Sequence, residues 1–290
     1  MTITVRTWPV PARPLTAGGG QRVDLQTARR CLAVWGIFET YAKLDVDGAE
    51  LAFLPEWDAS QPPVTPTSAD WRVTPKISHL RLVDLCASHG IRVPVVHINR
   101  DVGTRLSSES RDSILSGQKV LNEDLAAASV LESEIGVLYL WDTYAESLNI
   151  DKLFARVYEV SRDHRIRLAI ENIPISDPNL TTSEVWTRLS EIIPRDYGFT
   201  LDLSWSSLYD DFAELLTHMS RILHVHVQGA VSSTADGRRT LVPRVGKLDI
   251  LDSLGELCSA GYDRTITLEL HRPTGLHDFE TALDLIASRI

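Results

Sequence analysis

The stretch RIRLAIEN, residues 165–172, has the composition of a buried strand but carries a glutamate near its end. Alternate side chains of a strand share a face, so Glu171 lies with Arg167 and Ala169, whereas the isoleucines and the leucine point to the opposite face. An ionised carboxylate in apolar surroundings costs several kcal/mol unless a partner offsets the lost hydration. Glu171 therefore needs a partner, and Arg167 is one candidate.

Three later apolar runs repeat this arrangement, because each turns one ionisable group away from its aliphatic face. The runs and their groups are FTLDLSW at 199–205 with Asp202, RILHVHVQG at 221–229 with His226, and RTITLELH at 264–271 with Glu269. All four groups lie at or near the carboxyl ends of predicted strands. His224 lies two residues deeper than His226, and we expect it to be a core or supporting histidine.

A shared metal ion explains these four residues together. A single strand-end carboxylate is commonly a helix cap or an ion-pair partner, but three carboxylates at one rim repel one another without a cation. The recurrence predicts a divalent metal site with Glu171, Asp202, His226 and Glu269 as ligands. Mostly oxygen donors with one nitrogen favour Mn²⁺, with Mg²⁺, Co²⁺ and Zn²⁺ as alternatives.

Short apolar runs alternate with amphipathic stretches along the whole chain, which is typical of repeated βα units. This predicts an α/β fold, a single (β/α)8 TIM barrel over residues 1–290. A doubly wound sheet would need a Gly-rich phosphate turn after an early strand, and GGG at 18–20 does not fit that pattern. Strands are expected near 3–9, 48–54, 91–98, 136–141, 166–172, 197–203, 221–228 and 264–270. Helices are expected at 25–44, 75–89, 109–134, 150–163, 181–192, 209–219, 249–260 and 277–289.

Two long segments follow predicted strands and are expected to be βα loops at the carboxyl end of the barrel. The first covers about 55–75 and carries Trp57 and Trp71, which are candidates for a pocket wall. The second covers about 228–247. An irregular connection without a role in the site is the alternative for the first loop.

Composition limits the classes of function and the cellular compartment that are expected. The chain of 290 residues has a formal net charge of −10, which disfavours a protein that wraps duplex nucleic acid. Its three cysteines are far apart and form no C-x-x-C pair, which indicates buried thiols in a reducing compartment. The sequence shows neither a signal peptide nor an apolar run of membrane-spanning length, so a cytoplasmic protein is expected.

At the level of motifs the chain resembles the xylose-isomerase-like (β/α)8 superfamily. It is most similar to the sugar phosphate isomerase/epimerase group, which is related to endonuclease IV. The motifs are AIEN at 169–172, TLDLS at 200–204, HVHVQ at 224–228 and GYDRTITLEL at 261–270, preceded by KLDVDGAELAF at 43–53 and IRVPVVHI at 91–98. The resemblance is clearest from Gly90 to the end of the chain.

The resemblance implies the same metal set, Glu171, Asp202, His226 and Glu269, and one divalent ion. It also implies that Glu171 and Glu269 are the catalytic acid and base of an isomerase or epimerase acting on a small polyhydroxylated or cyclic carbonyl compound. In such a reaction a proton leaves the carbon beside the carbonyl, an enediolate forms, and a proton returns. The expected partner is a small molecule, not nucleic acid or a membrane, and a homodimer is an open alternative to a monomer.

The chain departs from the group's pattern at two positions that concern the substrate. Sugar epimerases of the group usually have D-x-x-H after strand six, whereas this chain has Trp205. They also tend to have an arginine six residues after the strand-seven histidine, where this chain has Ser232. The candidates to replace that arginine are Arg238, Arg239 and Arg244. The residues predicted to bind substrate are His97, Trp205, Trp141 and Arg100, and each has a structural role as its alternative.

Three other functions compete with isomerisation. A lyase or dehydratase of the inosose or dehydroshikimate type begins with the same proton abstraction, so the sequence does not separate it from an epimerase. A catalytically silent metal-binding barrel is the second competing function. An endonuclease IV-like nuclease is disfavoured by Trp205 and by the absence of D-x-H in 228–247.

Overall fold

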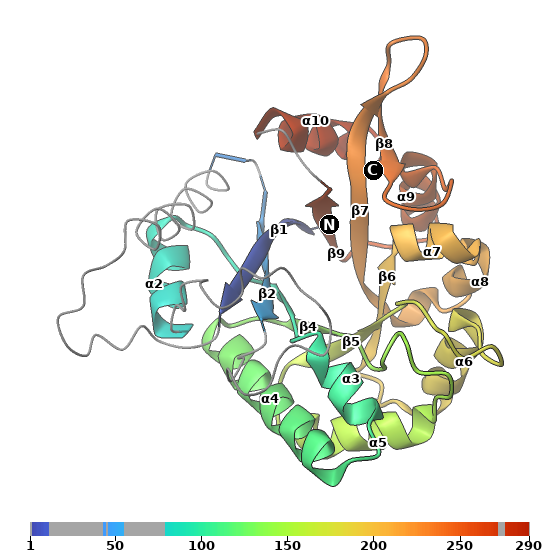
Figure 1. Ribbon diagram of the computed structural model, residues 1–290. Helices are drawn as coiled ribbons and strands as arrows, with labels where there is room; N and C mark the ends of the chain where they lie inside the picture. The colour runs from blue at the N-terminus through green and yellow to red at the C-terminus, as the bar shows by residue number, and fades with distance from the viewer. Residues whose placement is uncertain (1, 12–42, 45, 55–78, 272–275, 290) are drawn as a thin grey trace, which may run out of the picture. The chain divides into compact units, whose positions relative to one another are not determined.

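The computed structural model describes the chain except for residues 1, 12–42, 45, 55–78, 272–275 and 290 (Figure 1). The expected loop at 55–75 and nearly all of the expected helix at 25–44 lie outside the described residues. The chain divides into two compact units. Unit 1 comprises Met1–Arg6, Thr143–Asp151 and Leu168–Ile290, and unit 2 comprises Thr7–Asp142 and Lys152–Arg167.

Unit 1 is built on parallel strands and helices. In this unit β6 pairs with β5 on one side and with β7 on the other, β7 pairs with β9, and the first residues of β1 pair with β9, all in parallel. The strands are β1 (Thr2–Pro11), β5 (Arg167–Glu171), β6 (Gly198–Asp202), β7 (Ile222–Ser233) and β9 (Thr265–Leu270). The helices are α6 (Thr182–Ile192), α7 (Leu203–Tyr209), α8 (Phe212–Leu216), the 3₁₀ turn η2 (Met219–Arg221), α9 (Ile250–Ser259) and α10 (Leu276–Ala287).

Unit 2 has the same local plan, with parallel pairing of β2 to β3 and of β3 to β4. Its strands are β2 (Gly48–Leu54), β3 (Val95–His97) and β4 (Ile135–Leu138). Its helices are α2 (His79–Ser88), α3 (Asp101–Ser107), α4 (Arg111–Val130) and most of α5 (Ile150–Ser161). In the described part of the chain, no helix is both long enough and apolar enough to cross a membrane.

The predicted alternation of side chains is present in unit 1. The aliphatic residues of the strands, such as Leu201 and Val225, are fully buried. On the same side, Trp186 of α6 stacks on Phe199 of β6 with ring centroids 4.3 Å apart and an angle of 9° between the planes. Such a pair contributes aromatic packing beyond the area that it removes from water. It fixes α6 against the sheet.

The structure corrects two expected element boundaries and one expected ion pair. Strand six ends at Asp202, not at 203, because the Asp202 side chain caps α7, which begins at the next residue. The single helix expected at 209–219 is replaced by α8 and η2. Arg167 does not pair with Glu171, because its guanidinium lies 3.7 Å from the Glu134 carboxylate and is 40% exposed.

The segment 228–247 is not the long βα loop that the sequence predicts. Strand β7 continues to Ser233 and pairs in an antiparallel manner with β8 (Arg239–Pro243), so the segment is a hairpin. Figure 1 shows this hairpin, in orange, extending away from the helices of unit 1. Thr234 and Gly237 form the turn, with the Gly237 backbone at a positive φ of 81°.

Candidate functional site

Three of the four predicted metal ligands meet on neighbouring strands of unit 1. The Nδ1 atom of His226 lies 3.5 Å from Oε2 of Glu171 and 4.0 Å from Oδ2 of Asp202. All three side chains are at most 1% exposed. They offer one ligand atom each, and these atoms lie within 4.8 Å of one another. We call Glu171, Asp202 and His226 the buried triad.

The register of the strands explains how the triad forms. Asp202 of β6 is level with His226 of β7, which is level with Thr267 of β9. Residues that are level on neighbouring strands point to the same side, so these three define one rung of polar side chains on the inner face. Glu171 is level with Thr200, which precedes Asp202 by two residues.

Glu269, the fourth predicted ligand, lies one rung further along. It is level with Gln228, two residues beyond His226, and it is half-buried. Its negative charge is felt at Asp202, where it helps to raise the carboxyl pKa. Glu269 is therefore near the triad at the rim, but it does not belong to the compact group of three.

Asp202 uses its two carboxylate oxygens differently. Oδ1 accepts hydrogen bonds from the backbone N–H groups of Ser204 at 2.7 Å and Trp205 at 3.0 Å, which caps α7. Oδ2 is buried and has no hydrogen-bond partner among the described residues. Burial, and next the negative charge of Glu171, raise the pKa of Asp202 to about 7, although His226 opposes the shift.

Asn172 holds the backbone of Asp202 in place. Its side-chain Nδ2 donates to the Asp202 carbonyl at 3.1 Å, and the Asp202 N–H donates to its Oδ1 at 2.6 Å. The side chain is 1% exposed. Asn172 is not among the site residues predicted from the sequence, although its position directly after the strand-end glutamate is a signal for such a role.

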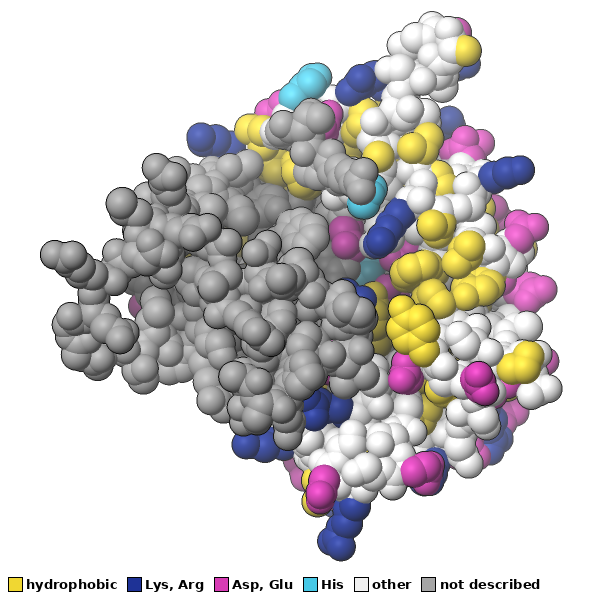
Figure 2. Space-filling model, viewed as in Figure 1, with side chains coloured by type: hydrophobic (Ala, Val, Ile, Leu, Met, Phe, Trp, Pro, Cys, Tyr) yellow, Lys and Arg dark blue, Asp and Glu magenta, His cyan; other side chains and the backbone are white. Residues whose placement is uncertain are grey.

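Helix α7 joins the site to the base of the hairpin. The Ser204 hydroxyl donates to the carbonyl of Gln228 and accepts from the Arg244 N–H at 3.0 Å. The Ser207 hydroxyl accepts from the Leu248 N–H at 2.8 Å. Gly246 fits here because its φ is +79° and a Cβ would lie 2.2 Å from the Ser207 carbonyl oxygen. Figure 2 shows apolar side chains gathered over α7.

Two further predicted residues lie beside the triad in unit 1. His224 is fully buried and packs edge-on against His226, with ring centroids 4.9 Å apart, which agrees with a core or supporting role. Trp205 is partly exposed, but its indole Nε1 is buried without a hydrogen-bond partner among the described residues.

The other predicted substrate-binding residues, His97, Trp141 and Arg100, belong to unit 2. His97 is fully buried, its Nδ1–H donates to the Ile98 carbonyl at 2.8 Å, and its ring meets that of Tyr139 edge-on at 4.8 Å. Trp141 is 1% exposed. Arg100 is exposed, with its guanidinium 5.7 Å from the Tyr139 ring centre. Their roles in binding a substrate stay predictions.

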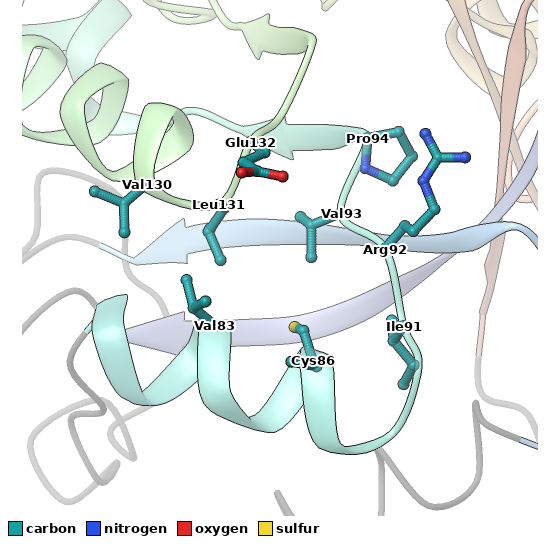
Figure 3. A pocket seen from close by; sticks show the side chains of 10 residues that line it. Val83, Cys86, Ile91, Arg92, Val93, Pro94, Val130, Leu131 and Glu132 are labelled. Atoms are coloured by element: carbon teal, nitrogen blue, oxygen red, sulfur yellow. The ribbon is translucent and has the colours of Figure 1, made fainter.

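A cavity of about 320 Å³ in unit 2 has a different character (Figure 3). It lies at the amino end of β3, and side chains of α2, including Val83 and Cys86, face Leu131 and Val93 across it. Burial raises the pKa of the Cys86 thiol to about 11, so this thiol stays protonated and unreactive near neutral pH. The cavity lies at the end of the strand where barrel enzymes do not build their sites.

Comparison with known proteins agrees with this architecture. A model of the xylose isomerase-like TIM barrel family matches residues 38–289. No curated protein matches the chain in sequence. Among the solved structures that share its fold, three are described below, and at 13–18% identity each of them shows the fold alone. The predicted TIM barrel is thus confirmed.

The three structures are epimerases or epimerase-like by name. A D-tagatose 3-epimerase-like protein has a TM-score of 0.62 and 18% identity over 99% of this chain and 97% of its own. D-psicose 3-epimerase from Clostridium cellulolyticum H10, with D-tagatose, has a TM-score of 0.63 and 14% identity over 100% and 99%. The 3-keto-D-glucoside 4-epimerase from E. coli has a TM-score of 0.61 and 13% identity over 99% and 98%.

Proposed function

Because the chain belongs to the xylose isomerase-like TIM barrel family, we propose that it is a divalent-metal-dependent isomerase or epimerase of a small carbonyl sugar. The observation that carries the proposal is the buried triad, which gathers two carboxylates and an imidazole on one rung and its neighbour. The epimerase names of the solved structures with the same fold support the reaction class.

The donor set fits a divalent cation. Two buried carboxylates in close proximity repel each other unless a proton or a cation lies between them. The buried Oδ2 of Asp202 accepts no hydrogen bond from any described residue, so it is placed to bind such a cation. Glu171, Asp202 and His226 would hold the ion, and Glu269 is the proposed fourth ligand from the next rung. Oxygen donors with one nitrogen favour Mn²⁺.

The bound ion would supply Lewis acidity that polarises the substrate carbonyl and acidifies the neighbouring C–H. Within the chain, Glu171 and Glu269 are the proposed proton carriers. One carboxylate removes the proton from the carbon beside the carbonyl, which leaves an enediolate, and the other returns a proton to complete the epimerisation. Glu171 lies deep in the site whereas Glu269 is half-buried at the rim, so the two carboxylates reach the substrate from different depths.

The surrounding residues orient these groups. Asn172 and the two capping amides of α7 fix the Asp202 carboxylate, and His224 packs against the ring of His226. Nearly complete burial of the triad excludes water, which strengthens each electrostatic interaction in the site.

Solvent deuterium exchange tests the proposal directly. Protein loaded with Mn²⁺ is incubated in D₂O with D-tagatose, D-fructose and further ketoses, and deuterium at the carbon beside the carbonyl is followed by NMR. We expect wild-type protein to incorporate deuterium, and Glu171→Gln and Glu269→Gln to lose at least a hundredfold in rate, a loss typical of a missing acid or base.

Asp211→Asn is the matched control for loss of a buried carboxylate. Asp211 is buried and accepts a hydrogen bond from the Ser206 hydroxyl at 2.8 Å, but it lies outside the triad. It should keep the wild-type exchange rate. Absence of exchange with every ketose in protein that demonstrably holds Mn²⁺ would refute the isomerase assignment, and loss of water from the sugar would identify a lyase.

A further inference from the structure

Gln228 carries a buried polar atom that the proposed reaction does not use. Its side chain is 6% exposed, and Oε1 has no hydrogen-bond partner among the described residues. It lies two residues beyond His226 on the same face of β7 and level with Glu269. A buried amide oxygen that accepts no hydrogen bond is costly, so its retention beside the site indicates a partner that arrives with a ligand.

Trp205 presents the complementary group from the neighbouring element. Its backbone N–H donates to Asp202, and the preceding residue, Ser204, hydrogen-bonds to the Gln228 carbonyl. The start of α7 is thus held against β7 at Gln228. The indole Nε1–H is buried without a partner among the described residues. One unused acceptor and one unused donor therefore lie on two elements joined by a hydrogen bond.

We propose that Gln228 and Trp205 form a neutral specificity pair that recognises a hydroxyl-bearing end of the substrate, one rung beyond the triad. The inference rests on the proposed function, because it assigns the substrate class of that same site. An amide oxygen accepts a hydrogen bond from a hydroxyl, and an indole N–H donates one to a hydroxyl oxygen. Neither group carries a charge, so the pair matches an uncharged sugar.

The carboxylates around the pair disfavour a phosphorylated sugar. Glu269 is level with Gln228, and Asp202 is next to the start of α7. Two of the three arginines that could have served an anion are paired with carboxylates: Arg239 lies 3.8 Å from Asp278, and Arg238 lies 2.7 Å from Asp236. The third, Arg244, contacts Ser204 through its backbone N–H and is the one cation of this set beside the pair. A phosphate dianion beside these carboxylates would be repelled.

Binding measurements separate this inference from the proposed reaction. Calorimetric titrations of Mn²⁺-loaded protein use two probes, D-tagatose and D-tagatose 6-phosphate. We expect D-tagatose to bind wild-type protein at least fivefold more tightly than its phosphate. Trp205→Phe and Gln228→Met should each weaken D-tagatose binding about five- to tenfold, which corresponds to one neutral hydrogen bond. Mn²⁺ affinity should change less than twofold.

Trp186→Phe is the matched control. Trp186 also has a buried Nε1 without a partner among the described residues, but it lies in α6 against Phe199, on the outer side of the sheet. This variant should bind D-tagatose as wild type does. The inference is overturned if folded Trp205→Phe binds as tightly as wild type, if the control loses as much, if the phosphate binds better, or if wild type binds neither sugar. Loss of deuterium exchange with intact sugar binding would instead overturn only the reaction.

Discussion

Replacement of Asp202 by asparagine removes a buried charge and keeps the helix cap, because asparagine caps helices as well as aspartate does. In wild-type protein without metal, the pKa of Asp202 is raised from 3.8 to about 7, chiefly by burial and by the charge of Glu171. The folded protein therefore holds this proton more tightly than the unfolded chain. The resulting stability is fully present below pH 3.8 and is lost as the pH rises through about 7.

The size of this effect follows from the shift. A shift of roughly 3 pK units corresponds to about 4 kcal/mol over the whole range, of which about 3 kcal/mol is lost between pH 5 and pH 8. Asparagine does not titrate, so Asp202→Asn avoids this loss. For a chain of this size, about 3 kcal/mol shifts the melting temperature by roughly 6 °C.

Thermal unfolding followed by circular dichroism measures the difference between the two proteins. In EDTA, the melting temperature of Asp202→Asn relative to that of wild type should rise by roughly 6 °C from pH 5 to pH 8. Added Mn²⁺ should reverse the order, because it stabilises wild type by binding the folded state and finds one carboxylate fewer in the variant. Asp211→Asn, whose carboxyl pKa is raised to about 6 by burial, serves as the control and should not alter the response to Mn²⁺.

Two results would refute this reasoning. If the melting temperatures of wild type and Asp202→Asn in EDTA change in parallel from pH 5 to pH 8, folding does not raise the pKa of Asp202 as expected. If Mn²⁺ stabilises both proteins equally, Asp202 does not contribute to metal binding.

Three further substitutions test local features of unit 1. Asn172→Leu should destabilise the protein by about 3 kcal/mol in urea unfolding and weaken Mn²⁺ binding, because two hydrogen bonds to the Asp202 backbone are lost in a buried position; unchanged unfolding would contradict this role. Gly246→Ala should lower stability by about 2 kcal/mol or more, since its φ is positive and a Cβ would collide with Ser207. Gly255→Ala, in open space within α9, should instead raise stability by about 0.5–1 kcal/mol, and a loss would show that the space is not open.

Much of the strand framework could be predicted because side-chain alternation depends only on local sequence. Asp202 of β6 and His226 of β7 lie on the inner face, as the alternation in FTLDLSW and HVHVQ predicts, and the structure pairs the two residues. Register between strands depends on packing, and the sequence does not reveal it. The alternation of side chains therefore groups Glu269 with the triad as a predicted metal ligand. The strand pairing in the structure instead places Glu269 opposite Gln228, two residues beyond His226 along β7.

The parts that sequence reasoning missed depend on tertiary contacts. Helix α7 is short and rich in serine, so it has no clear helical period, and it forms because Asp202 caps it and Ser204 and Ser207 fasten it to the chain after β8. The sequence predicts a loop at 228–247 because the segment follows the predicted seventh strand, yet β8 pairs with an extension of β7 that continues beyond His226. Substrate-binding roles for residues of unit 2 depend on more than local pattern and stay predictions.

The two oxygens of the Asp202 carboxylate have different surroundings, and this difference has a consequence for the ions that the proposed site would prefer. One oxygen is held by two backbone amides at the start of α7, so the group can rotate little and can offer a cation only its other oxygen. Calcium favours six to eight oxygen ligands and often takes both oxygens of a carboxylate. A monodentate Asp202 therefore biases the proposed metal centre against large, high-coordination ions and toward small ones.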